Sequence, residues 1–201
     1  MAHACIVTDT QQRLLQQYCK HLWSWNKRLN LTRHTDYEAF VSRDLRDSQQ
    51  LANHLQSGES LLDAGSGGGV PGIVLAVLNP ALTVSLSEST QKKAAVLKTI
   101  TGEMNLPMAV FAQRAEDVLG SHSFDTICAR AVAPLKKMVL WFRPQRPRMG
   151  RLLLVKGPAW KIERDEAAEA GLLGAVDLQV LSEYATAGRR GKSVILEVRF
   201  Q

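Results

Sequence analysis

The stretch Ser60-Leu61-Leu62-Asp63-Ala64-Gly65-Ser66-Gly67-Gly68-Gly69-Val70-Pro71-Gly72 decides the fold of this chain. Its short apolar start predicts a buried strand, and its glycines let the backbone turn tightly and approach a ligand closely. Pro71 suits the first turn of a following helix, where its missing N–H costs nothing. A strand, a glycine loop and a helix in this order are typical of a nucleotide-type cofactor site in a doubly wound sheet.

The glycine loop admits four interpretations besides a turn that binds no ligand. The spacing of glycines over 67–72 formally satisfies the dinucleotide fingerprint, but an acid just ahead of the glycines, here Asp63, is not part of that pattern. A phosphate-binding P-loop needs lysine after the last glycine, where this chain has Ile73. A nucleophile elbow around Ser66 needs a histidine late in the chain, and the last histidine is His122.

The fourth interpretation makes use of the acid. Residues 61–69 read hydrophobic-x-Asp-x-Gly-x-Gly-x-Gly, which resembles the first motif of class I S-adenosylmethionine-dependent methyltransferases. The ammonium group of that cofactor is attracted to a carboxylate such as Asp63, whereas a pyrophosphate is repelled. Glu88 ends the next expected strand, where an acid accepts hydrogen bonds from both ribose hydroxyls. Its alternative role is a helix cap, which Ser89 would share.

The chain is helical first and then alternates between strands and helices. Apolar residues recur at helical spacing from about residue 9, and a second helix is expected over about 36–54. Strands are expected over 60–64, 82–87, 108–111, 124–129, 150–155, 178–181 and 194–200. Helices are expected over 71–78, 89–104, 134–142 and 160–173. This alternation predicts an α/β fold with a seven-stranded, mostly parallel sheet.

The expected organisation is an N-terminal helical cap over 1–56 and a Rossmann-like domain over 57–201, forming one compact unit. The basic stretch 143–148 is expected to be a cationic loop, with a solvated turn as its plainest role.

The net charge of +6 over 201 residues suggests an anionic partner such as nucleic acid, although charge alone does not decide this. The three scattered cysteines have no metal-binding spacing and favour a reducing cytoplasm. Neither a signal peptide nor a bilayer-spanning stretch is recognisable, so no membrane partner is expected.

Further motifs carry a family resemblance over about residues 14–199. They are Trp25-Asn26-Lys27-Arg28-Leu29-Asn30-Leu31-Thr32, Arg43-Asp44-Leu45-Arg46-Asp47-Ser48, Val70-Pro71-Gly72-Ile73, Glu88-Ser89 with Lys92-Lys93, Arg130-Ala131-Val132-Ala133, Lys156-Gly157 and Arg189-Arg190. Together they resemble the RsmG (GidB) family of bacterial 16S ribosomal RNA guanine-N7 methyltransferases. Their counterparts there are WNxxxNLT, RHxxDS, GxGxxPGI, DSxxKR and RAxA. Asp44 departs from the family's histidine, and Glu88 replaces its usual aspartate.

The resemblance and the loop chemistry together imply that S-adenosyl-L-methionine is the cofactor. Its expected contacts are Asp63, Gly65, Ser66, Gly67, Val70, Glu88, Ala115, Glu116 and Arg130. Glu116 alone would more often be a first-turn acid that matches a helix dipole. The implied substrate is 16S ribosomal RNA, either naked or within a small-subunit particle, and a monomer is expected. Candidate RNA contacts are Asn30, Lys92, Lys156 and Arg189, with Lys93, Lys136, Lys137 and Arg190 as further phosphate-binding candidates.

The implied chemistry requires no general base and no metal. Guanine N7 already has an in-plane lone pair, so positioning and electrostatics supply the acceleration. The fourth expected strand lacks the motifs with which other methylases hold exocyclic amines or attack pyrimidine carbon, and Cys128 is expected to be a small buried strand residue. Arg130 is expected to bind cofactor, RNA phosphate or guanine O6, or to form an ion pair. Asn26 and Asn30 are expected either to cap turns or to contact RNA.

Three other functions remain open from the residues. A methyltransferase of the same fold could act on another RNA base, a protein or a small molecule. A non-catalytic RNA-binding relative could keep the fold without turnover. A nicotinamide oxidoreductase would use the formal dinucleotide fingerprint.

Overall fold

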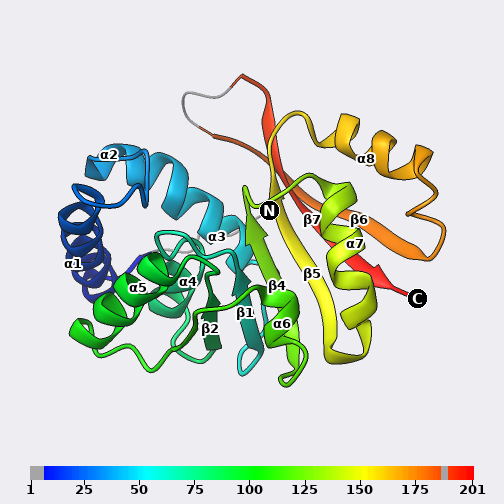
Figure 1. The fold of residues 1–201 in the computed structure, drawn as a ribbon. Coiled ribbons are helices and arrows are strands. Elements are labelled where there is room, and N and C mark those ends of the chain that lie inside the picture. The colour runs from blue at the N-terminus through cyan, green and yellow to red at the C-terminus, as the bar shows by residue number, and fades with distance from the viewer. Residues whose placement is uncertain (1–6, 187–189) are drawn as a thin grey trace.

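Seven strands form one mixed sheet in the order β3-β2-β1-β4-β5-β7-β6 (Figure 1). The structure is a computed structural model that describes residues 7–186 and 190–201. The strands are β1 Ser60–Ala64, β2 Thr83–Ser87, β3 Ala109–Phe111, β4 Phe124–Arg130, β5 Met149–Lys156, β6 Val176–Ala185 and β7 Lys192–Phe200. The first five pair in parallel, and β7 runs antiparallel to both β5 and β6. The predicted seven-stranded, mostly parallel α/β fold is confirmed.

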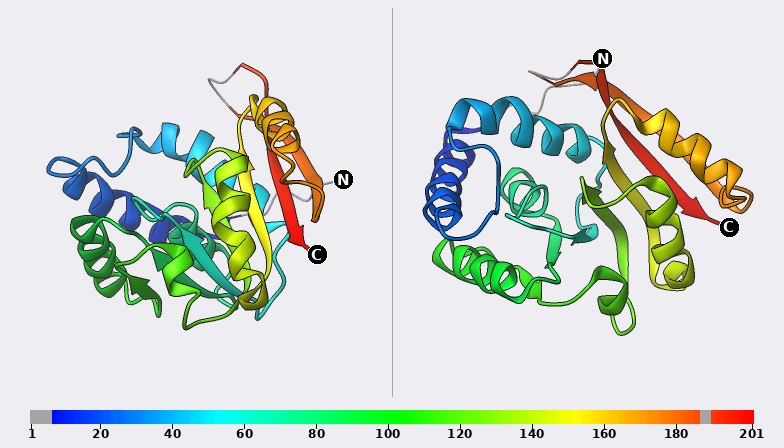
Figure 2. Two further views of the ribbon diagram at one scale, coloured as in Figure 1. Left: turned by 45° about the vertical axis from the view of Figure 1, so that its right-hand side comes forward. Right: turned by 45° about the horizontal axis from the view of Figure 1, so that its top comes forward.

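Helices cover both faces of this sheet (Figures 1 and 2). They are α1 Asp9–Asn26, α2 Tyr37–Ala39, the π-helix η1 Phe40–Leu45, α3 Arg46–Ala52, α4 Gly72–Leu78, α5 Gln91–Glu103, α6 Ala115–Val118, α7 Leu135–Phe142, the 3₁₀-helix η2 Arg143–Arg148 and α8 Trp160–Glu169. Successive strand residues point to opposite faces, so Leu61 packs with α1, α4 and α5 while Leu62 packs with α7. Among the described residues no helix is both long and apolar enough to cross a membrane.

The N-terminal helix α1 shares a hydrophobic core with the sheet. Leu15, Tyr18 and Leu22 recur at helical spacing, are at most 1% exposed and pack in the same cluster as Ile73 of α4. Burying a leucine side chain of this kind contributes about 2 kcal/mol before entropic costs. A capping box around Thr8 begins the helix by satisfying backbone N–H groups that have no partner within it. These contacts fix α1 beside the glycine loop.

Three helical elements differ from the sequence-based expectations. The segment expected to be one helix over 36–54 consists of α2, η1 and α3. The sequence did not predict this division, because apolar periodicity does not reveal a single widened π-helical turn. The expected cationic loop 143–148 is the 3₁₀-helix η2, whose prolines remove α-helical hydrogen bonds. Helix α8 ends at Glu169 and does not continue to 173 as expected. Two residues later Gly171 has a φ of 69°, a left-handed conformation that ends a helix.

The edge strand β6 is also longer than the expected 178–181. Its pairing with β7 runs from Val176 to Ala185 and absorbs a register shift between Val180 and Ser182. The polar residues along β6 face solvent at the sheet edge, so apolar runs in the sequence mark only its middle.

Candidate active site

The glycine loop after β1 has backbone conformations that side chains disfavour. Gly65, Gly67 and Gly69 have φ values of 70°, 56° and 102°. A Cβ on Gly65 would also lie 2.9 Å from Cγ2 of Val132, in the segment after β4. The loop therefore needs glycine both for its turn and for the close approach of a neighbouring strand end.

Asp63 lies beneath this loop at the end of β1. Its side chain is buried, Oδ2 accepts a hydrogen bond from the Gly72 N–H at 3.0 Å, and Cys128 Sγ donates to Oδ1 at 3.8 Å. Burial raises the pKa of Asp63 to about 6, although the bond from Gly72 opposes the rise. The carboxylate thus ties the loop to the start of α4 and is poised to respond to a cation. Cys128 is confirmed as a small buried strand residue.

Ser66 and Glu88 join the loop to the second strand. Ser66 Oγ donates to the Asp63 carbonyl at 2.9 Å and accepts from the Ser87 N–H at 3.2 Å, so its buried side chain is used within the protein. Glu88 accepts from the Gly67 N–H at 2.9 Å and from the Thr90 N–H at 2.7 Å. The helix cap that was the alternative role of Glu88 is not formed, because Thr90 is the residue that precedes α5 and no side chain in the described part of the chain caps the first N–H groups of that helix. A carboxylate oxygen has a second lone pair, so the ribose contact stays a prediction.

A cavity of about 210 Å³ adjoins the loop at the carboxyl edge of the sheet. It is lined by predicted residues from distant parts of the chain, Gly65, Ala115 and Glu116, together with Val132 and Phe142. An apolar wall with a few convergent polar groups suits a purine ring that carries an exocyclic amine. The residues present therefore fit the adenosine part of the implied cofactor. Val70 is half-buried against the core and does not line this cavity.

Arg130 emerges from β4 and forms a buried network with acids of η1 and α3. Its Nη1 donates to Asp44 Oδ1 at 2.5 Å and to Asp47 Oδ2 at 3.3 Å. His34 Nδ1 lies 2.9 Å from Asp44 Oδ2, and Tyr184 Oη donates to Asp47 at 2.9 Å. Burial acts to lower the pKa of Arg130, but the two aspartates raise it above its usual value. The ion pair predicted as one alternative is present, and Asp44 supplies the nearer of its two carboxylates.

The predicted RNA contacts do not gather in one place. Asn30 lines a cavity of about 750 Å³ together with Arg130, whereas Lys92 is exposed near the start of α5. Lys156 is buried, and its Nζ donates to the Ala133 carbonyl at 2.6 Å and to Glu163 at 2.7 Å. That ammonium therefore already has an acidic partner. Arg189 lies outside the described residues.

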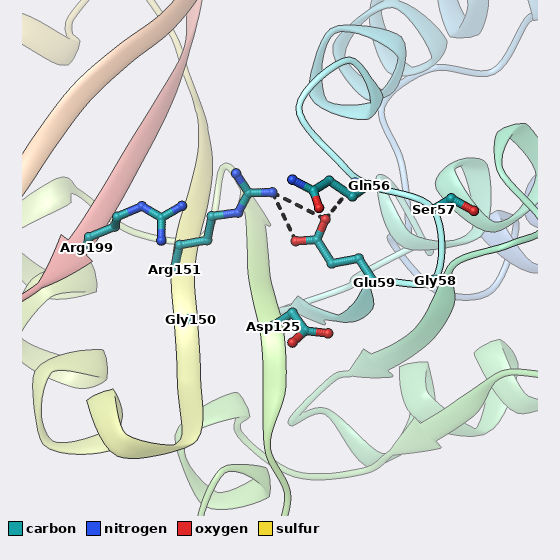
Figure 3. A pocket seen from close by; sticks show the side chains of 8 residues that line it. All are labelled: Gln56, Ser57, Gly58, Glu59, Asp125, Gly150, Arg151 and Arg199. Atoms are coloured by element: carbon teal, nitrogen blue, oxygen red, sulfur yellow. Dashed lines mark hydrogen bonds and ion pairs between the residues drawn. The ribbon is translucent and has the colours of Figure 1, made fainter.

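A different cavity, of about 420 Å³, lies at the opposite edge of the sheet (Figure 3). Arg151 is one of its lining residues and donates to Glu59 at 3.0 Å and to Glu197 at 3.0 Å. Arg199 also donates to Glu197, so the basic groups are matched by acids. Ligands of doubly wound sheets bind at the carboxyl ends of the strands, and this cavity lies at the other ends. We therefore assign it a structural role.

Two contributions to the site gave no sequence signal of their own. Tyr18 Oη donates to the Gly68 carbonyl at 2.7 Å and fastens α1 to the glycine loop. The Arg130–Asp44 ion pair links the cap to the end of β4, and His34 contacts the other carboxylate oxygen of Asp44. Helical spacing predicted that Tyr18 is buried, but the partner of its hydroxyl depends on tertiary packing.

The fold has counterparts among solved structures. MtNAS in complex with MTA and tNA matches with a TM-score of 0.62 and 14% identity, covering 95% of this chain and 71% of that one. The mitomycin 7-O-methyltransferase MmcR matches with a TM-score of 0.57 and 17% identity, covering 96% and 67%. At these identities the likeness concerns the fold alone, and that fold is the class I S-adenosylmethionine-dependent methyltransferase fold.

Sequence relatives define the family. The sequence model of the family described as rRNA small subunit methyltransferase G (GidB) matches residues 11–189. Ribosomal RNA small subunit methyltransferase G of Rhodopirellula baltica is 50% identical over 170 residues, which cover 85% of this chain and 74% of the relative. That of Chromobacterium violaceum is 38% identical over 152 residues, covering 75% and 73%. The chain belongs to this family of methyltransferases, which confirms the predicted resemblance.

Proposed function

We propose that this protein transfers a methyl group from S-adenosyl-L-methionine to N7 of a guanine in 16S ribosomal RNA. The observation that carries the proposal is the buried Asp63 beneath a glycine loop whose neighbouring cavity is lined by Ala115 and Glu116. An acidic residue at this point suits a cofactor with an ammonium group. Family membership supports ribosomal RNA as the substrate class.

S-adenosyl-L-methionine would supply an electrophilic methyl group bonded to a sulfonium. In the proposed reaction the N7 lone pair forms the new bond to carbon as the sulfur–carbon bond breaks in line. Guanine N7 loses no proton, and the positive charge moves from sulfur to the base. The chain therefore has to position the reactants and exclude water, without a side chain that removes a proton.

The proposed cofactor contacts divide into three groups. Gly65, Gly67 and Val70 of the loop would approach the amino-acid end, with Asp63 attracting its ammonium group and Ser66 holding the loop through its buried hydroxyl. Glu88 would accept from the ribose, and the backbone of 115–116 would contact the adenine. Arg130 stays a proposed contact for the cofactor or the RNA. Within the described residues only its Nη1 bonds to protein groups, so its other N–H donors are left for a ligand.

Labelled methyl transfer to 16S ribosomal RNA from a strain that lacks the gene tests the proposal. We expect one labelled guanine, and mapping should place the label on N7. Label on an exocyclic nitrogen or on a pyrimidine carbon would exclude the proposed acceptor. Cofactor binding without transfer to small-subunit particles or to naked RNA would favour the non-catalytic RNA-binding alternative.

Calorimetric titration tests the cofactor site separately. Gly65→Ala should abolish binding of S-adenosyl-L-methionine, because its Cβ would meet Val132 and crowd the cavity. Gly171→Ala is the matched control, since Gly171 has nearly the same φ of 69° but nothing within 4 Å of an added Cβ. It should bind with wild-type affinity. Tighter binding of NAD(H) than of S-adenosyl-L-methionine would instead support an oxidoreductase.

A further inference from the structure

The loop that follows α1 is held by one asparagine and presents another. Asn26 Oδ1 accepts hydrogen bonds from the backbone N–H groups of Leu31 at 2.8 Å and Thr32 at 3.0 Å. Asn30 is exposed, and its side-chain amide makes no hydrogen bond to any residue that the structure describes. From the sequence, each of the two asparagines was expected either to cap a turn or to contact RNA. The structure gives the turn to Asn26 and leaves the Asn30 amide free for a ligand.

This loop lies directly against the glycine loop of the cofactor site. A Cβ on Gly68 would lie 3.0 Å from the carbonyl oxygen of Leu31. The same loop lines the cavity of about 750 Å³, where Asn30 lies with Arg130 and Ala131. The next residue, Val132, lines the smaller cavity proposed for adenosine. The larger cavity thus adjoins the expected position of the methyl donor, and its volume is in the range of ligand-binding pockets.

Two arginines in the wall of this cavity have no acidic partner in the part of the chain that the structure describes. Arg33 is exposed and Arg43 is half-buried, and neither side chain forms an ion pair or hydrogen bond within residues 7–186 and 190–201. Arg130, in contrast, is paired with two aspartates. A guanidinium without an acidic partner binds phosphate through two parallel hydrogen bonds. The cavity therefore combines a free amide with two groups suited to a nucleic-acid backbone.

We propose that this cavity is the subsite for the acceptor nucleotide, in which Asn30 reads the Watson–Crick edge of the guanine and Arg33 and Arg43 bind the flanking phosphates. The proposal rests on the proposed guanine-N7 transfer. N7 has to face the methyl donor, so the Watson–Crick edge on the far side of the purine is left for recognition. The Asn30 carbonyl accepts from the guanine N2 amino group, provided that the base is turned out of its stack.

Replacing the acceptor base tests the role of Asn30. The substrate is 16S ribosomal RNA, naked and reconstituted into small-subunit particles, carrying either guanine or inosine at the methylated position. Inosine retains N7 but lacks the N2 amino group. Wild-type protein should lose about tenfold in kcat/KM with inosine, because one specific base contact is lost. Asn30→Ala should lose about tenfold in kcat/KM with guanine and little more with inosine, since the substitution and the base change remove the same interaction.

Exposed Asn53 at the end of α3 provides the matched control. Asn53→Ala should retain wild-type activity and the wild-type penalty for inosine. If Asn30→Ala showed the same inosine penalty as wild-type protein, the base-reading role would be wrong. If wild-type protein placed no methyl group on N7, the proposed function would fail and the reading of guanine would fail with it.

The arginines are tested by binding without turnover. Affinity for 16S ribosomal RNA is measured across a range of salt concentrations for wild type, Arg33→Gln and Arg43→Gln. Each variant should reduce the slope of log K against log salt by about 0.7, the value for one phosphate contact on a single strand. Cofactor affinity should not change. Arg13→Gln, on the exposed side of α1, should keep the wild-type slope. Unchanged slopes in both cavity variants would overturn the phosphate contacts, whether or not methyl transfer is observed.

Discussion

Replacing Asp63 by asparagine should stabilise the cofactor-free protein near neutral pH. Burial raises the pKa of this carboxyl from 3.8 to about 6, so the folded state binds its proton more tightly than the unfolded state does. Its stabilising contribution is fully present below the unfolded pKa and is lost as the pH rises through about 6. With about 1.4 kcal/mol per pKa unit, ionisation of Asp63 costs about 3 kcal/mol near pH 7.5 and about 1 kcal/mol near pH 4.5.

Asparagine keeps the acceptor for the Gly72 N–H but carries no charge to bury. Urea denaturation should therefore show Asp63→Asn to be more stable than wild type by up to about 3 kcal/mol near pH 7.5, with a smaller gain near pH 4.5. Asp125→Asn is the control, because hydrogen bonds from Ser60 lower the pKa of this exposed carboxyl and the substitution should bring no gain. A variant at Asp63 that is no more stable than wild type at either pH would refute the reasoning.

The same substitution should weaken cofactor binding, because the neutral amide no longer attracts an ammonium group. In wild-type protein, binding of S-adenosyl-L-methionine should weaken as the pH falls below about 6 and Asp63 becomes protonated. Calorimetry in buffers of different ionisation enthalpy should detect proton release near that pH. If affinity were independent of pH between about 5 and 8 in wild-type protein, the proposed Asp63–ammonium contact would be wrong.

Two further predictions concern the packing around the site. Gly72→Ala places a Cβ 2.3 Å from Leu86 Cδ2 and should lower the free energy of unfolding by about 1–3 kcal/mol, whereas Gly102→Ala in α5 meets nothing within 4 Å and should raise it by roughly 0.5–1 kcal/mol. Urea denaturation of both variants measures the contrast, which a Gly72→Ala protein of wild-type stability would contradict. Tyr184→Phe removes the hydrogen bond to buried Asp47 and should cost about 1–2 kcal/mol in unfolding free energy, with a less than twofold change in cofactor affinity by calorimetry. A large loss of affinity without a loss of stability would indicate a direct role for Tyr184 in binding.

The sequence determined the architecture because its signals are local. Apolar runs of strand length alternate with helical periodicity, and each of the seven expected strands lies within or close to an observed one. The glycine loop, Asp63 and Glu88 could be placed because strand ends in a parallel sheet meet at one edge. Local patterns did not reveal the π-helical turn of η1, because apolar periodicity does not distinguish one widened turn from an α-helix. They also missed the full length of β6, because that length depends on pairing with β7.

Only the tertiary structure decided how the predicted site residues are used. Arg130 and Lys156 looked alike as basic residues at strand ends, yet each is paired with acids from segments far away in the sequence or on a neighbouring helix. Asn26 and Asn30 looked alike in one motif, yet one holds the loop and the other faces a cavity. The physical reason is that charge and hydrogen-bonding capacity belong to a residue type, whereas the partner that satisfies them is fixed by packing in three dimensions.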